Sequence, residues 1–101
     1  MTTGDNPMPT MTEMNSDTRQ ELIDRLKRIE GQARGIQKMI DDGRDCEQVM
    51  TQIAALKAAT HALSGEMLEA WTIFCMSHPD RFASPEIAAR KMVDLVVKNS
   101  R

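Results

Sequence analysis

The two cysteines are the residues of this chain whose type and spacing are most informative chemically. Cys46 and Cys75 are the only cysteines, and the stretch between them contains no proline and predicts one continuous α-helix. The roughly 29 residues that separate them span roughly 43 Å of α-helix, whereas a disulfide requires Cα atoms within about 7 Å. The two thiols therefore cannot meet within one subunit. They can meet if two copies of the helix lie antiparallel, so that Cys46 of one chain faces Cys75 of the other.

The two thiols differ in their predicted surroundings. Cys46 follows Asp45, a good N-cap, and so falls in the first helical turn, where the dipole and free N–H groups favour a thiolate. For Cys46, a reactive or metal-binding thiol and a small half-buried side chain stay equally open. Cys75 follows Trp71 and Phe74 at the other end, where a buried apolar cysteine is common. The pairing across an antiparallel dimer favours a functional role for both.

A histidine near the second thiol raises the question of metal binding. His78 lies three residues after Cys75, on the same face of a helix. Cys46 of one chain with Cys75 and His78 of another would make a three-coordinate site for a soft metal. The alternative is a surface histidine at a helix C-terminus, where positive charge is stabilised, and we favour that alternative.

The first predicted helix begins near Ser16–Thr18, where Thr18 and Glu21 fit a capping box. Gly43 ends it as the C′ residue. Between these signals, apolar residues alternate at spacings of four and three, which predicts a heptad seam. The seam residues are Leu22, Leu26, Ile29, Ala33, Ile36 and Ile40.

Two further helices complete an all-α subunit with two long helices and one short one. The second runs from Cys46 to about Ser77, because Pro79 disfavours helix at the residue before it. The third begins at Pro85 and ends near Lys98. No alternating strand pattern is present. Only three aromatic residues occur, which makes a thin core for a monomer, so we expect oligomerisation.

The chain is expected to form one domain. Residues 1–15 contain two prolines and no apolar periodicity, which predicts a flexible tail, and residues 16–101 form the helical domain. The first residues lack the apolar segment of a secretory signal, and no stretch approaches the roughly 20 apolar residues of a membrane span. We therefore expect a cytoplasmic protein with no membrane contact.

A basic face on the first helix could bind nucleic acid. The net charge of −2 excludes a global basic field, but Arg25, Arg28 and Gln32 share one helical face, which Lys57 could extend. The alternative is a solvated, ion-paired surface, and a helical adaptor that binds another protein also stays open. No acid–base pair, nucleotide loop or catalytic triad is visible, so we expect no enzymatic activity.

The sequence from Arg25 to Gln32 (RLKRIEGQ), followed by Cys46 and by VMTQIAALK ending at Lys57, resembles the CsoR/RcnR/FrmR family of bacterial repressors. The resemblance covers roughly residues 17–98. It implies three-helix subunits that form antiparallel dimers and then tetramers, bind double-stranded operator DNA, and release it when an inducer occupies an intersubunit thiol site. It also implies DNA contacts from Arg25, Arg28, Gln32 and Lys57, with Arg34 as a weaker candidate.

The resemblance also bears on the inducer. Copper-binding members have a histidine at the position of Trp71, and indole has no lone pair to give to a metal. The branch with two cysteines and no such histidine resembles the persulfide-sensing CstR repressors. The main hypothesis is therefore that Cys46 attacks a persulfide or polysulfide and that Cys75 of the partner closes a bridge, without a cofactor. The alternative is a Cu(I) sensor that uses Cys46, Cys75 and, in one version, His78.

Overall fold

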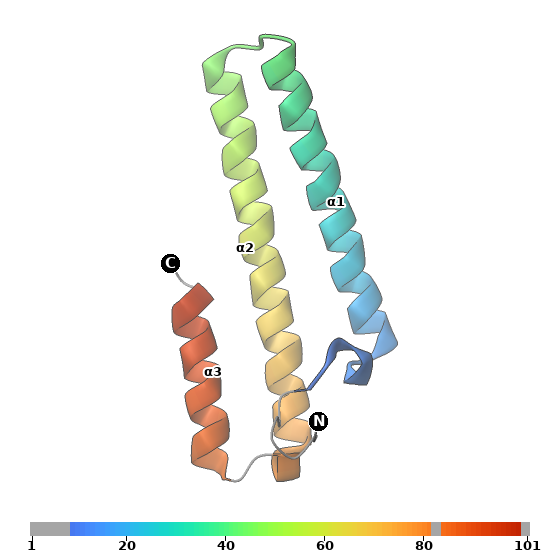
Figure 1. The fold of residues 1–101 in the computed structure, drawn as a ribbon, viewed down its shortest axis with the longest axis vertical. Helices are drawn as coiled ribbons and strands as arrows, with labels where there is room; N and C mark the ends of the chain where they lie inside the picture. The colour runs from blue at the N-terminus through green and yellow to red at the C-terminus, as the bar shows by residue number, and fades with distance from the viewer. Residues whose placement is uncertain (1–8, 82–83, 100–101) are drawn as a thin grey trace, which may run out of the picture. The chain divides into compact units, whose positions relative to one another are not determined.

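A computed structural model describes residues 9–81 and 84–99, and in this part of the chain every regular element is helical. The predicted all-α class, with two long helices and one short one, is confirmed (Figure 1). Residues 1–8 of the predicted tail, residues 82–83 and residues 100–101 lie outside the described residues. The elements are η2 (Met11–Glu13), α1 (Ser16–Asp41), α2 (Cys46–Ser77), η3 (Pro79–Arg81) and α3 (Pro85–Asn99).

Helix α1 begins at Ser16, within the predicted range, but its N-cap differs from the sequence prediction. The Asn15 side chain accepts a hydrogen bond from the Asp17 backbone N–H at 2.7 Å, which is the geometry of an N-cap. The predicted capping box of Thr18 and Glu21 is wrong, because Thr18 already lies inside the helix. Asn15, the last residue of the predicted tail, thus caps the helix.

The turn between α1 and α2 follows the prediction. Gly43 has φ +75°, and its N–H donates to the Ile40 carbonyl at 3.2 Å, while the Arg44 N–H donates to the Met39 carbonyl at 3.0 Å. These two bonds form a Schellman motif, which satisfies carbonyls at the helix end and needs a left-handed residue at C′. Gly43 is therefore confirmed as the residue that ends α1.

Helix α2 begins and ends where the sequence predicted. Asp45 Oδ1 accepts the Gln48 N–H at 2.9 Å, so Cys46 is the first helical residue, and the helix is unbroken to Ser77. Ser84 Oγ accepts the Ile87 N–H at 3.2 Å and caps α3. Because α2 is unbroken, its two cysteines lie at opposite ends of one helix.

The chain divides into two compact units. The first, Gln20–Glu66, is an antiparallel hairpin of α1 and the first part of α2 (Figure 1). Along the predicted seam Leu22 and Ile36 are buried, whereas Leu26 is 50% exposed and Ile40 61% exposed. One chain therefore covers only part of the seam.

The second unit combines the residues up to Arg19 with those from Met67 onward. Its core consists of Met14, Trp71 and Cys75, all less than one-tenth exposed. Side chains of α2 and α3 pack against this cluster, namely Met67, Leu68, Phe74, Ala88, Met92 and Leu95. The second cysteine is thus part of a small apolar core.

The N-terminal segment differs from the predicted flexible tail through residue 15. Residues 10–15 contain the turn η2, and Met14 is buried at 8% exposure against Trp71 and Cys75. No sequence pattern places this methionine in a core, because the segment has no apolar periodicity. Its partners come from helices more than fifty residues away in the chain.

Large apolar side chains stay exposed on both units. A monomer of this size rarely leaves so many uncovered, and contiguous apolar surface usually marks an interface. The predicted dimer and tetramer are not observed in one chain and stay predictions. The most exposed of these side chains are Leu26, Ile40, Met50, Ile73, Met76, Val93 and Val97.

No helix in residues 9–81 and 84–99 has both the length and the apolar character required to cross a membrane.

We predict that Gly43→Ala lowers the free energy of unfolding by about 1 to 2 kcal/mol, because an L-residue at positive φ meets its own carbonyl. Gly43→Asn should lose less, since asparagine tolerates the left-handed region. Urea unfolding followed by circular dichroism at one protein concentration measures both. Equal stability of Gly43→Ala and the parent chain would contradict this account of the turn.

Candidate thiol site and nucleic-acid interface

Cys46 is exposed at the first position of α2. Its position is fixed by the Asp45 cap and by Gln48, whose Oε1 also accepts a hydrogen bond from Arg44 Nε at 3.0 Å. Both interactions tie the turn to the first helical residues. The thiol is therefore held at a defined point of the surface, where a metal ion or a reagent can reach it.

Cys75 has the opposite environment. It is 7% exposed and packs with Met14 and Trp71. Burial raises the pKa of the Cys75 thiol, because the thiolate loses hydration, and the positive charge of Arg81 offsets part of that effect. In the isolated chain Cys75 is thus a covered, protonated thiol at neutral pH.

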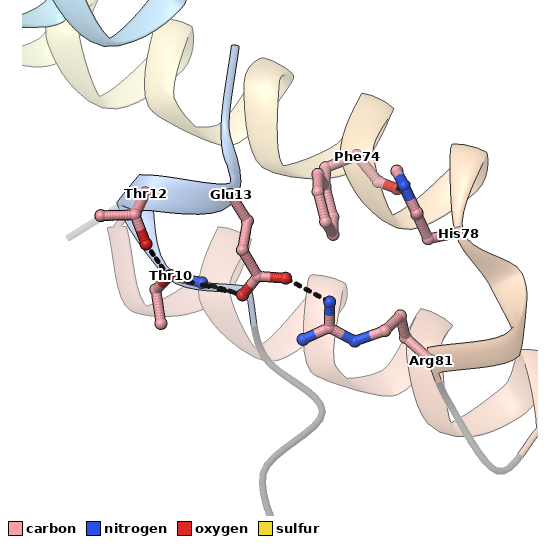
Figure 2. A network of polar contacts seen from close by, with 6 residues as sticks. All are labelled: Thr10, Thr12, Glu13, Phe74, His78 and Arg81. Carbon is pink, nitrogen blue, oxygen red and sulfur yellow. Dashed lines mark hydrogen bonds and ion pairs between the residues drawn. The ribbon is translucent and has the colours of Figure 1, made fainter. Parts of the chain in front are cut away.

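A polar network lies beside this core (Figure 2). Glu13 accepts a hydrogen bond from the Thr10 backbone N–H at 2.8 Å and forms an ion pair with Arg81. The guanidinium of Arg81 also lies 5.7 Å from the centre of the Phe74 ring. Arg81 and the Thr10 backbone hold the pKa of the Glu13 carboxyl below its usual value, because they stabilise the charged form.

His78, which directly follows α2, contacts Phe74 near the end of that helix. Its ring stacks on Phe74, with centroids 4.1 Å apart and 15° between the planes, and its Nδ1 lies 2.9 Å from the Phe74 carbonyl oxygen. Among residues 9–81 and 84–99, no three His, Cys, Asp or Glu side chains gather in a way that could hold a metal ion. A metal site that includes His78 would therefore need ligands from a second chain, and Nε2 would be the ring nitrogen left to bind the metal.

The predicted DNA-contacting residues all lie on the hairpin unit, but they are not equally available. Arg28, Gln32 and Lys57 are exposed. Arg25 is about one-third exposed and forms an ion pair with Glu66 of α2, while Arg34 lies 3.6 Å from Glu30. Sequence reasoning identified the basic residues and missed Glu66.

Three residues around Cys75 were also missed, namely Met14, Glu13 and Arg81. No local pattern marks them, because each acts through a partner from a distant segment. The one available signal was the Glu13 side chain three residues after Thr10, which fits a capped turn.

Comparison with known proteins identifies the family. The sequence profile described as metal-sensitive transcriptional repressor matches residues 18–98. The chain belongs to this family. It is 32% identical to the copper-sensing transcriptional repressor CsoR of Bacillus subtilis over 93 residues, which cover 92% of each protein. The predicted family is therefore confirmed, whereas the finer assignment to the persulfide-sensing branch is not.

Two other copper-sensing repressors are similar to this chain, one over about half of its sequence and one in its three-dimensional structure. The copper-sensing repressor RicR of Mycobacterium tuberculosis is 38% identical over 53 residues, 52% of this chain and 55% of that protein. The crystal structure of the copper-sensing repressor CsoR with Cu(I) from Geobacillus thermodenitrificans superposes with a TM-score of 0.78 at 34% identity. The superposition covers 91% of this chain and 96% of the CsoR chain. The family members are repressors, which agrees with the expected lack of enzymatic activity.

We predict that the Cys75 thiol titrates above the ordinary cysteine value of 9.0, because its burial disfavours the thiolate. The ultraviolet absorbance of the thiolate, measured against pH in the Cys46→Ser variant, reports Cys75 alone. The same variant in urea should titrate at the ordinary value. An unshifted curve for the folded variant would show that Cys75 is hydrated.

The raised pKa of Cys75 makes the stability of the fold depend on pH. A raised pKa in the folded state means that the unfolded chain releases its proton first. The free energy of unfolding should therefore be unaffected below the ordinary thiol pKa and should fall as pH rises from there toward the raised value.

Proposed function

We propose that this repressor binds operator DNA and releases it when an inducer engages Cys46 of one subunit and Cys75 of another. The observation that supports it most is the placement of the two thiols at the ends of one unbroken helix in a chain of this family. Within a subunit, 29 residues of helix keep the thiols apart, as the sequence indicates. A site that uses both therefore needs a second chain.

The uncovered apolar surface supports the oligomer that this site requires. Met50 near the start of α2 is 62% exposed, and Ile73 and Met76 near its end are 59% and 77% exposed. Each buried apolar Å² contributes about 25 cal/mol, so association along α2 is favourable. An antiparallel arrangement would bring the start of one α2 beside the end of the other.

Cu(I) is the inducer that the comparisons favour, because the relatives with named inducers are copper sensors. The side chains at the proposed site supply some of the ligands that Cu(I) needs. Thiolate sulfur is a ligand type that selects Cu(I), and Cys46 and Cys75 would supply two. Trp71 stands where the resemblance places the third ligand, and it cannot coordinate a metal. The alternative predicted from sequence thus has stronger support than the main hypothesis.

Reactive sulfur is a second candidate, and one observation favours it. Trp71 is 6% exposed and packs with Cys75, so the position of the third ligand is filled by an apolar ring. Two thiols without a third donor are sufficient for sulfur chemistry. The Cys46 thiolate would take sulfane sulfur from a persulfide and release the reduced thiol. The partner's thiolate at Cys75 would then attack the Cys46 sulfur, form a disulfide and release hydrosulfide.

Phosphate contacts by the hairpin unit would supply the DNA affinity. Arg28, Gln32 and Lys57 are exposed there, and repetition by symmetry would lengthen the basic surface. Arg25 contributes only where DNA competes with Glu66 for its guanidinium. We expect backbone contacts and DNA shape to matter as much as base edges, because the helices of residues 9–81 and 84–99 do not form a helix-turn-helix motif.

The inducer test uses fluorescence anisotropy with the DNA upstream of the protein's own gene. We predict that stoichiometric Cu(I), added without oxygen, lowers DNA affinity at least about tenfold, a coupling of about 1.4 kcal/mol. Cys46→Ser and Cys75→Ser should each abolish the response while DNA binding without inducer is kept. Cu(I) binding is checked separately by competition with a chelator.

Polysulfide in place of Cu(I) separates the two candidates. DNA release together with a Cys46–Cys75 crosslinked dimer in mass spectra would assign the sulfur reaction. If Cu(I) also fails to release DNA, copper is excluded as the inducer. If neither inducer changes DNA affinity, control by the thiol pair is wrong. If no fragment is bound in a salt-dependent way, the adaptor alternative replaces the repressor.

For the DNA interface we predict that Arg28→Gln weakens binding and reduces the slope of log affinity against log salt by about one for each subunit that loses a phosphate contact. Lys38→Gln is the control, since Lys38 is also exposed on α1 but outside the predicted set. An equal loss in both variants would indicate a general charge effect instead of a contact by Arg28.

A further inference from the structure

The residues 10–15 lie over the core that contains Cys75, although the matched family region begins only at residue 18. Met14 from this segment is buried at 8% exposure in the same cluster as Trp71 and Cys75. The thiol is therefore covered from one side by a side chain that precedes α1. Helix α3 covers the cluster with Ala88, Met92 and Leu95.

The segment is attached at one further point. Glu13 binds the Thr10 N–H through one carboxylate oxygen and Arg81 through the other (Figure 2). The Glu13 side chain thus connects its own turn to the residue that ends η3. The Glu13 and Arg81 side chains are 35% and 31% exposed, so water and salt reach this ion pair and it is a weak attachment.

An open pocket borders the same segment. It has a volume of about 310 Å³ and is lined by Met14, Asn15 and Thr18 on one side and by Ile73, Phe74 and His78 of the α2 end on the other. The segment is therefore not packed along its whole length. Met14 and the Glu13–Arg81 pair attach it to the rest of this unit.

We propose that residues 10–15 form a strap that closes over Cys75 and is held by the Glu13–Arg81 ion pair and by Met14. Opening of the strap exposes the thiol, while Cys46 is exposed at all times. The strap thereby controls the rate at which an inducer reaches the Cys75 thiol. It also controls which inducers can reach it. It matters for sensing only through the proposed role of Cys75, but its existence is testable without DNA or inducer.

The test is the alkylation rate of Cys75 by N-ethylmaleimide in the full-length Cys46→Ser chain, followed by mass spectrometry. Met14→Ala should raise the rate at least about tenfold, because the covering side chain is removed. Met14→Leu, which keeps the volume, should stay within about twofold. Thermal melting of each variant shows whether the fold is retained, and the rate of the urea-unfolded chain gives the upper limit.

The ion pair is tested separately, because Met14→Ala also changes the core. Glu13→Gln and Arg81→Gln should each raise the rate about two- to fivefold. The double variant should be no faster than either single one, since both break the same interaction. Arg90→Gln, at an exposed position of α3, is the control and should leave the rate unchanged.

Three results would overturn the strap. One is a parent chain whose Cys75 reacts as fast as in urea. Another is an unchanged rate in Met14→Ala. The third is a slower reaction in Arg81→Gln, which would mean that Arg81 acts only as a positive charge that favours the thiolate. None of these results depends on whether Cu(I) or sulfur controls DNA binding.

Discussion

Helix α2 carries more apolar surface than one chain can cover, and this constraint governs the rest of the molecule. It runs unbroken from Cys46 to Ser77, but within it only Trp71 and Cys75 are buried. Burial of apolar area is the main source of folding free energy, so two long helices and one short helix gain little of it within a single chain. In the proposed oligomer a second copy covers these side chains, and the two thiols lie at the two ends of α2.

The same helix gives its two cysteines opposite environments. Cys46 is in the first turn, where few neighbours exist and the thiol is exposed, whereas Cys75 is in the one place where three segments converge. Burial raises the pKa of the latter and limits access to it. At the proposed intersubunit site, Cys46 is therefore the thiol that an inducer can reach first.

Trp71 is the residue on which the choice of inducer depends. Its indole fills the core beside Cys75 and offers no lone pair, so two sulfurs are the donors that remain at the proposed intersubunit site. The relatives named as copper sensors favour Cu(I), and the filled position favours sulfur transfer. Both proposed chemistries require the same encounter between Cys46 and the partner's Cys75.

The sequence by itself determined the local structure: the helices, the glycine turn at Gly43, the Asp45 cap and the continuity of α2 follow from propensities and capping within a few residues. It also identified the family through a contiguous motif. Only the tertiary structure placed Met14 on Cys75 and paired Arg25 with Glu66, because those contacts join segments far apart in the chain and leave no periodic trace. Local hydrogen bonding fixed the elements, whereas burial and ion pairing between distant residues decided which thiol is covered and which arginine is already bound.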